Sequence, residues 1–114
     1  MKSQFKSKDY LEFMSSKSCR VTGARYGVDL HHESIIRKYS GGHVKYFDFG
    51  VIPLSHRLHI DVRHNTSKEK FWSSYKINYI QAVINYLEEY ISLDRVDKDL
   101  AIDALHLIRH EHDL

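Results

Sequence analysis

A short helix is predicted near the start of the chain, because apolar residues recur there at three- and four-residue intervals between polar ones. It begins after Ser7, whose side chain suits an N-cap, and ends near Ser16. Its apolar positions are Tyr10, Phe13 and Met14, with Leu11 beside them.

After residue 20 the pattern changes to one rich in aromatic and β-branched residues, which favours strands. Two strands are predicted within residues 21–30 and 43–54, around a loop centred on residues 39–42. The only proline, Pro53, is expected to close the second strand because it has no N–H to give to a ladder. A short helix over residues 54–64 follows.

From residue 67 onward the apolar positions return to a helical period. Thr66 and Glu69 predict a capping box at its start, and a break near residues 92–95 separates two helices. The stripes of these helices comprise Ile77, Ile80, Ile84, Leu87 and Ile91, with Tyr79, Val83, Tyr86 and Tyr90 beside them, and then Val96, Leu100, Ala104, Leu107 and Ile108. The fold class predicted is therefore α+β.

The length, cysteine content and charge of the chain limit its domain organisation, cellular location and partners. The 114 residues suit a single domain with a modest core, and the lone Cys19 excludes an internal disulfide. No run approaches eighteen apolar residues and the start has no signal-peptide pattern, so we expect a cytoplasmic protein without a membrane partner. Residues 1–64 carry eleven Lys/Arg and six Asp/Glu (+5), whereas residues 65–114 carry six and nine (−3), a distribution compatible with nucleic acid on the first part.

Nine histidines are many for this length, and six lie in the middle third. Adjacent strand residues face opposite sides, so His31 and His32 can divide two tasks: one binds a divalent cation while the other takes a proton from water, as metal-assisted phosphodiester hydrolysis requires. His56 and His59 share one helix face and can complete the metal site. An alternative metal site lies at the end of the chain, where His106 and His110 are four residues apart on one helix face and further donors are Glu111, His112 and Asp113.

The order of motifs C-x-x-T-G, H-H-E, G-G and D-F-x-V-I-P-L-S-H-x-x-H, followed by a further H, resembles the HNH endonucleases of the ββα-metal fold. The similarity is greatest to phage and prophage members associated with recombination, and it covers about residues 7–75. It implies a small ββα-metal core over about residues 17–66, an N-terminal helix, and two C-terminal helices in an extension over residues 67–114, all within a single domain of residues 1–114.

In that family two hairpin strands and one helix hold a single divalent cation, and a histidine activates water. Carried over by position, His31 resembles the metal ligand at the strand end, His32 the general base and His59 the metal ligand on the helix. His64 resembles a second ligand or a phosphate contact, and His56 stands between knuckle positions, where the family has a variable residue. The resemblance implies Mg²⁺, Mn²⁺, Ni²⁺ or Zn²⁺ as the cofactor and DNA as the partner.

Further residues are implied around this centre. Asp48 corresponds to the acidic residue before the P-L segment, where it orients the general base or caps the loop. Contacts to the DNA backbone are expected from basic residues, which read no sequence there. These are Arg37, Lys38, Lys45, Arg57 and Arg63.

Two departures from the family pattern leave a second function open. Cys19 is the one cysteine left at four zinc-knuckle positions, the others being Thr22, Ser55 and Leu58, so no structural zinc is expected. Apolar packing must replace it, and the candidates are Leu58 with Val21 and the long C-terminal helices. The asparagine that names the HNH motif is absent from "FDFGVIPL". The alternative is a catalytically degenerate HNH-fold protein that binds nucleic acid or inhibits or regulates a host protein.

The resemblance also bears on where the protein acts and with what. It implies a phage or prophage gene product in the cytoplasm of the bacterial host. The wide apolar stripe of the longer C-terminal helix suits pairing with a second copy, so a homodimer through the C-terminal helices is a further expectation. A host or phage protein is the alternative partner.

Overall fold

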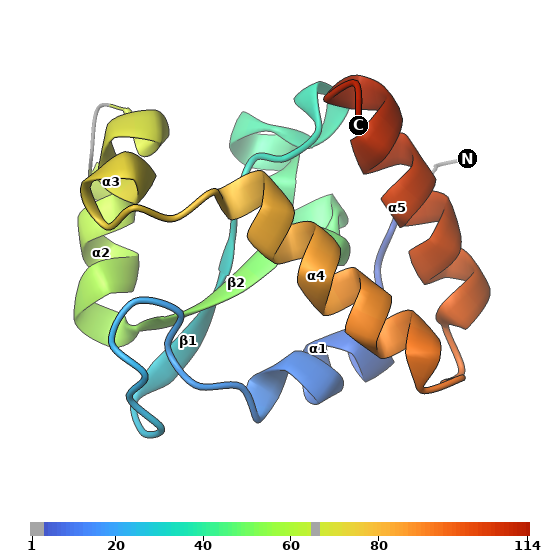
Figure 1. The fold of residues 1–114 in the computed structure, drawn as a ribbon, viewed down its shortest axis with the longest axis horizontal. Coiled ribbons are helices and arrows are strands. Elements are labelled where there is room, and N and C mark those ends of the chain that lie inside the picture. The colour runs from blue at the N-terminus through green and yellow to red at the C-terminus, as the bar shows by residue number, and fades with distance from the viewer. Residues whose placement is uncertain (1–3, 65–66) are drawn as a thin grey trace.

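The computed structural model describes residues 4–64 and 67–114, in which helices surround a two-stranded antiparallel sheet (Figure 1). Strand β1 (Val28–His32) pairs with β2 (Val51–Ser55), with Leu30 opposite Pro53. Helix α2 (His56–His64) begins directly after β2, so the two strands and this helix form a ββα unit. The predicted α+β class is confirmed.

The remaining elements lie before, between and after the parts of this unit. Helix α1 (Lys8–Ser15) begins at the predicted N-cap, where the Ser7 hydroxyl oxygen accepts the N–H of Tyr10 at 2.9 Å. Three short 3₁₀ helices connect the strands: η1 (Arg37–Tyr39), η2 (Gly41–Tyr46) and η3 (Asp48–Gly50). Three α-helices follow the unit: α3 (Lys68–Ser74), α4 (Tyr79–Ser92) and α5 (Lys98–Glu111).

The second strand is shorter than the sequence predicts, because the prediction of strand over residues 43–50 was wrong. These residues form η2 and η3, and a parallel bridge between Phe5 and Phe47 ties them to the N-terminal segment. Pro53 lies within β2 and does not end it. The Pro53 carbonyl accepts the N–H of Arg20 at 2.9 Å, so the backbone hydrogen-bonding groups of Pro53 face away from β1. The N–H that proline lacks would therefore make no hydrogen bond to β1.

The helical extension contains three helices, which corrects the prediction of two. The first stretch is interrupted after Ser74, where Lys76 takes a left-handed conformation with φ of 59°. A new helix then begins at Asn78, whose side chain accepts the N–H of Gln81. The N-cap of α3 is Ser67, which accepts the N–H of Lys70; the predicted capping residue Thr66 lies outside the described residues.

One hydrophobic core joins the ββα unit to the extension. Helix α4 packs against α5, β2 and η3, and its buried side chains include Val83, Leu87 and Tyr90. Trp72 of α3 is 1% exposed and belongs to the same core. Within the described part of the chain, no helix combines the length and apolar character needed to cross a bilayer.

Two of the zinc-knuckle positions of the resemblance, Thr22 and Ser55, lie beside Cys19, which is buried. Burial opposes ionisation of the thiol, but hydrogen bonds from the Thr22 hydroxyl and from the N–H groups of Thr22, Ser55 and Val21 outweigh it and lower the Cys19 pKa to about 7. Leu58 is buried in the core and Val21 packs against it. Hydrogen bonds and apolar contacts therefore hold this corner together in the structure.

Candidate functional site

Three of the predicted site histidines line one cavity of about 420 Å³. His31 and His32 come from the end of β1, and His59 comes from the second turn of α2. The rings of His31 and His59 meet edge to face, with centroids 5.2 Å apart. The rest of the wall is formed by Leu30, Gly41, Val44 and Arg63. We call this whole cavity the histidine cavity.

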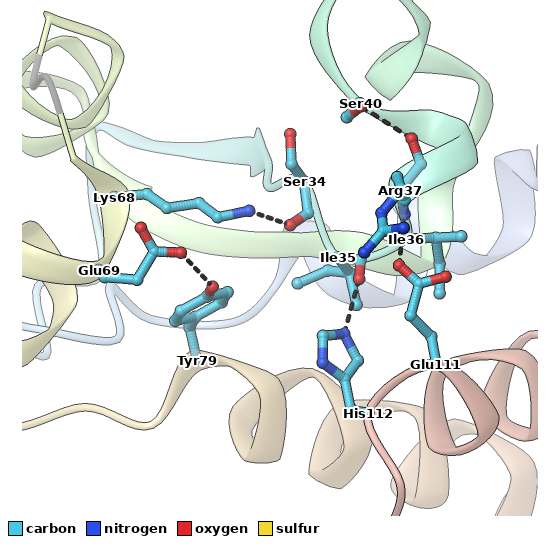
Figure 2. Close-up of a pocket in the computed structure, with 10 residues that line it drawn as sticks. All are labelled: Ser34, Ile35, Ile36, Arg37, Ser40, Lys68, Glu69, Tyr79, Glu111 and His112. Carbon is cyan, nitrogen blue, oxygen red and sulfur yellow. Dashed lines mark hydrogen bonds between the residues drawn. The ribbon is translucent and has the colours of Figure 1, made fainter.

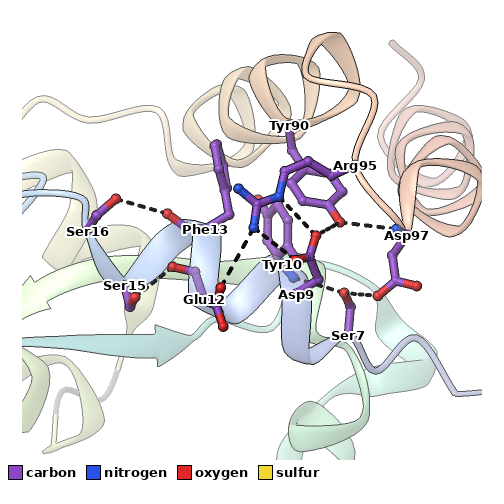
Figure 3. Close-up of polar contacts among 10 residues, drawn as sticks. All are labelled: Ser7, Asp9, Tyr10, Glu12, Phe13, Ser15, Ser16, Tyr90, Arg95 and Asp97. Carbon is purple, nitrogen blue, oxygen red and sulfur yellow. Dashed lines mark hydrogen bonds and ion pairs between the residues drawn. The ribbon is translucent and has the colours of Figure 1, made fainter.

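His32 is held by Asp48, which lies in η3 just before β2. The Nε2 atom of His32 is 2.9 Å from Asp48 Oδ1, and Asp48 itself is 1% exposed. The other carboxylate oxygen, Oδ2, accepts the backbone N–H of Ser7 at 2.8 Å. Figure 3 shows that Ser7 in turn donates its hydroxyl to Asp97. Asp48 therefore orients His32, as one of the two predicted roles requires, and is itself fixed by the N-terminal segment.

His59 is held by Asp29 of β1, a residue that the sequence reasoning missed. The Nδ1 atoms of His59 and His56 lie 2.9 Å and 2.8 Å from the same oxygen, Asp29 Oδ2. Hydrogen bonds from the two imidazoles, that of His59 first, lower the pKa of Asp29. The shared helix face of His56 and His59 is thus used to bind a carboxylate on the neighbouring strand.

His31 is held by Glu33, which the sequence reasoning also left out of the site. Glu33 Oε1 lies 3.3 Å from His31 Nε2 and accepts the indole N–H of Trp72 at 2.7 Å. Burial disfavours the charged carboxylate, but these hydrogen bonds outweigh it and lower the pKa of Glu33. Asp29 and His31 of β1 and Glu33, just after its end, stand two residues apart, and this period-two pattern is the signal that would have identified both carboxylates.

The three pairs fix which ring nitrogen of each histidine is available. An ionised carboxylate only accepts hydrogen bonds, so the nitrogen facing it carries the proton. This leaves Nδ1 of His31 and His32, and Nε2 of His59, as the basic nitrogens. His31 and His32 both reach the cavity although they are neighbours, because β1 ends at His32.

Other predicted residues lie outside the histidine cavity. The side chain of His56 is 71% exposed, and His64 is exposed at the end of α2; neither lines the cavity. Of the predicted DNA contacts, Arg63 lines it, and Lys45 lies in η2, which supplies Gly41 and Val44 to its wall. Arg57 and Lys38 are exposed elsewhere, Lys38 lying over the ring of Tyr39.

A second cavity, of about 310 Å³, is lined by the predicted DNA contact Arg37 and by Glu111 and His112 of the alternative C-terminal cluster (Figure 2). Its wall is built by the segment after β1, the starts of α3 and α4, and the end of α5. His112 donates to the Ile35 carbonyl at 2.7 Å, and Glu111 accepts the backbone N–H of Arg37 at 2.5 Å. These contacts dock the end of α5 against the chain that leaves β1. His112, from the alternative C-terminal cluster, is thus used in a structural contact.

The fit of a divalent cation depends on the donors of the histidine cavity. Nowhere in residues 4–64 and 67–114 do three His, Cys, Asp or Glu side chains converge in a group that could hold a metal ion. His31 and His59, however, each have one ring nitrogen bonded to a carboxylate, which is the usual arrangement of metal-ligating histidines. The centroids of these two rings lie 5.2 Å apart, so a cation bound between them would have to take its remaining ligands from water and a phosphate.

The ββα unit brings histidines from its first strand and its helix to one cavity. Each of the three histidines has its own carboxylate partner. These side chains are the basis for assigning a chemistry, since no protein-family model, curated protein or solved structure matches the chain.

Proposed function

We propose that the chain is an HNH-like endonuclease that hydrolyses DNA phosphodiester bonds with one divalent metal and a histidine general base. The observation that carries the proposal is the histidine cavity, in which three imidazoles are each bonded through one nitrogen to a separate carboxylate. The motif order resembles that of phage and prophage nucleases, which supports an action in the cytoplasm of a bacterial host.

His32 is the proposed general base. Its Nε2–H is donated to Asp48, so the Nδ1 lone pair is the one that accepts a proton from the attacking water. Asp48 holds this tautomer and stabilises the imidazolium that forms, while its own second oxygen is occupied by Ser7. A histidine in this arrangement needs no further partner to act as a base.

His31 and His59 are the proposed metal ligands, through Nδ1 and Nε2 respectively. A divalent cation held there would supply Lewis-acid stabilisation of the phosphate charge and of the leaving oxygen. His56 and His64 do not line the cavity, so we assign them no ligand role in this geometry. Arg63 lines the same cavity and is the proposed contact to the scissile phosphate, with Lys45 contacting the backbone nearby.

The second candidate is the catalytically degenerate HNH-fold protein that binds nucleic acid or regulates a host protein. The observation that favours it is the lack of three converging metal donors in the described residues, with two histidines in place of a larger set. Metal-dependent cleavage separates the two candidates.

The test is a plasmid nicking assay on the untagged protein in EDTA, Mg²⁺, Mn²⁺ or Ni²⁺, with single-stranded DNA as a second substrate. We expect nicking that EDTA abolishes and that His32→Ala lowers by roughly 10²–10⁴-fold, the usual contribution of a general base. His43→Ala is the matched control, because His43 is exposed on η2 and does not line the cavity. If the wild-type protein is inert with every metal on both substrates, the second candidate, a catalytically degenerate HNH-fold protein, replaces the nuclease as the proposed function.

A further inference from the structure

Glu33 is a buried carboxylate beside the histidine cavity that does not form part of its wall. It is 5% exposed, and both of its oxygens accept hydrogen bonds. Oε2 accepts the backbone N–H of Ser34 at 2.9 Å, and Oε1 accepts the indole N–H of Trp72 at 2.7 Å. Because Glu33 does not line the cavity, its influence on a bound group must pass through His31.

Burying a carboxylate costs free energy unless hydrogen-bond donors surround it, so the donors around Glu33 are what make its burial possible. Two of its three partners, Ser34 and Trp72, are fixed by the backbone and by the core, and Trp72 is 1% exposed. The third partner is His31, whose Nε2 lies 3.3 Å from Oε1. Glu33 is thus a rigid acceptor placed against the one nitrogen of His31 that does not need to face the cavity.

We propose that Glu33 is a positioning residue that holds His31 in the Nε2–H tautomer and presents its Nδ1 to the metal. The inference rests on the proposed function, since it concerns the same metal site. A carboxylate behind a ligating histidine fixes the orientation of the ring and strengthens it as a ligand, and loss of such a partner weakens metal binding by roughly 10–100-fold. Asp29 stands in the equivalent relation to His59.

The proposal also links the helical extension to the metal site. Trp72 lies on α3, outside the ββα unit, and shares the oxygen Oε1 of Glu33 with His31. Trp72 is the only tryptophan of the chain, so its fluorescence reports on this carboxylate. Zn²⁺ binding at His31 should therefore change the Trp72 emission without any added label.

The test is calorimetric and fluorescence titration of the untagged protein with Zn²⁺ alone, without DNA. Glu33→Gln should weaken the site by roughly 10–100-fold, and His31→Ala, which identifies the site among nine histidines, should remove the same binding step. Glu69→Gln is the control, because Glu69 is an exposed carboxylate on α3 that accepts the Tyr79 hydroxyl at 3.2 Å and does not line the histidine cavity. If the role of Glu33 were purely structural, Glu33→Gln would lower the unfolding midpoint and leave the Zn²⁺ affinity unchanged. That result would overturn the proposal.

A second measurement needs no variant and covers the case in which Glu33→Gln fails to fold. Long-range ¹H–¹⁵N spectra of the ¹⁵N-histidine protein, recorded well above the usual imidazole pKa, should show His31 protonated at Nε2. Protonation at Nδ1 would overturn the proposal. If wild type binds Zn²⁺ and nicks DNA but Glu33→Gln binds equally well, the role of Glu33 fails alone; if wild type neither binds nor nicks, the proposed function fails and this inference with it.

Discussion

Asp48 uses its two carboxylate oxygens for different purposes. One accepts the Ser7 N–H at 2.8 Å and the other accepts the His32 Nε2–H at 2.9 Å. An asparagine has a single oxygen, so it can keep only one of these two acceptor roles. Because the Ser7 N–H cannot reverse its polarity, the amide NH₂ would face His32 and drive the imidazole proton to Nδ1. The basic nitrogen would then point at the amide.

Asp48→Asn should therefore abolish nicking while largely keeping the fold. We expect the cleavage rate to fall by roughly 10²–10⁴-fold, as when the partner of a catalytic histidine is lost, with a stability loss of about 1–3 kcal/mol for the altered buried contacts. Single-turnover nicking and urea unfolding measure the two effects. Asp61→Asn, at an exposed position of α2, is the matched control. Cleavage at the wild-type rate by the folded Asp48→Asn protein would contradict the assignment of His32 as base.

The surroundings of Gly50 leave too little room for a side chain. A Cβ atom there would lie 3.1 Å from the Glu33 carbonyl oxygen, 3.1 Å from Ile35 Cγ1 and 3.3 Å from a Phe47 ring carbon. The Gly50 carbonyl also accepts the N–H of Glu33, so relief by backbone movement would disturb the end of β1.

Gly50→Ala should destabilise the protein by about 1–3 kcal/mol through overpacking. Gly42→Ala is the control, since a Cβ at Gly42 meets nothing within 4 Å. Urea unfolding of both variants is the measurement, and equal stability of the two would show that the loop before β2 relaxes more freely than the structure implies.

At the scale of elements, α1 is bound to the turn between α4 and α5 by a polar network (Figure 3). Arg95 donates to both oxygens of Asp9 at 2.8 Å and 3.0 Å, and the Tyr90 hydroxyl donates to Asp9 at 2.6 Å. Hydrogen bonds from Arg95 and then from Tyr90 lower the pKa of Asp9 from 3.8 to about 2. This network positions the helix whose N-cap, Ser7, supports Asp48.

The lowered pKa fixes the pH range in which this network contributes stability. A carboxylate with a depressed folded-state pKa stabilises the fold fully above its unfolded pKa, and the contribution is lost as the pH falls through the folded value. Asp9→Asn should thus be less stable than wild type at pH 6, and the difference should shrink between pH 4 and about 2. Urea midpoints of the two proteins across this range test the prediction; a difference independent of pH would mean that Asp9 acts by shape and not by charge.

The elements that the sequence predicted well are those set by local pattern. The Ser7 cap, α1, α2 and the last helix follow from capping and periodicity within a few residues. Residues 43–50 were predicted wrongly because their aromatic side chains, typical of strands, are instead used in contacts with the N-terminal segment, such as the Phe5–Phe47 bridge. A bridge between residues so far apart leaves no local signal.

The same distinction holds at the candidate site. The motif located His31, His32, His59 and Asp48, and the structure brings the three histidines to one cavity. The partners Ser7 and Trp72 were not predicted, because they are separated from Asp48 and Glu33 by 41 and 39 residues. The positions of the histidines can be read from the sequence. The side chains that bond to them are set by tertiary packing, which the sequence pattern does not show.

At the scale of the whole molecule, the apolar stripe of α4 bears on the expected homodimer. Ala82, Val83, Ile84, Leu87 and Tyr90 of this helix are buried within the chain against α5, β2 and η3. A homodimer through the C-terminal helices would therefore have to use other exposed apolar side chains, such as Leu93 and Val96 in the turn between α4 and α5. Pairing stays a prediction, but the stripe that suggested it serves the core.

The use of α4 and Trp72 in the core implies that the ββα unit cannot fold without the extension. A two-stranded sheet with one short helix is marginal by itself, and Glu33 would lose the indole that satisfies it. A fragment of residues 1–66 should therefore show no cooperative urea transition, whereas the full chain should show one, with circular dichroism as the measurement. Trp72→Phe in the full chain is the matched control, because it removes the indole N–H but keeps an aromatic ring in the core, and it should still unfold cooperatively. Cooperative unfolding of the fragment would instead make the extension a separate unit, and the site would then be held by residues 1–66 alone.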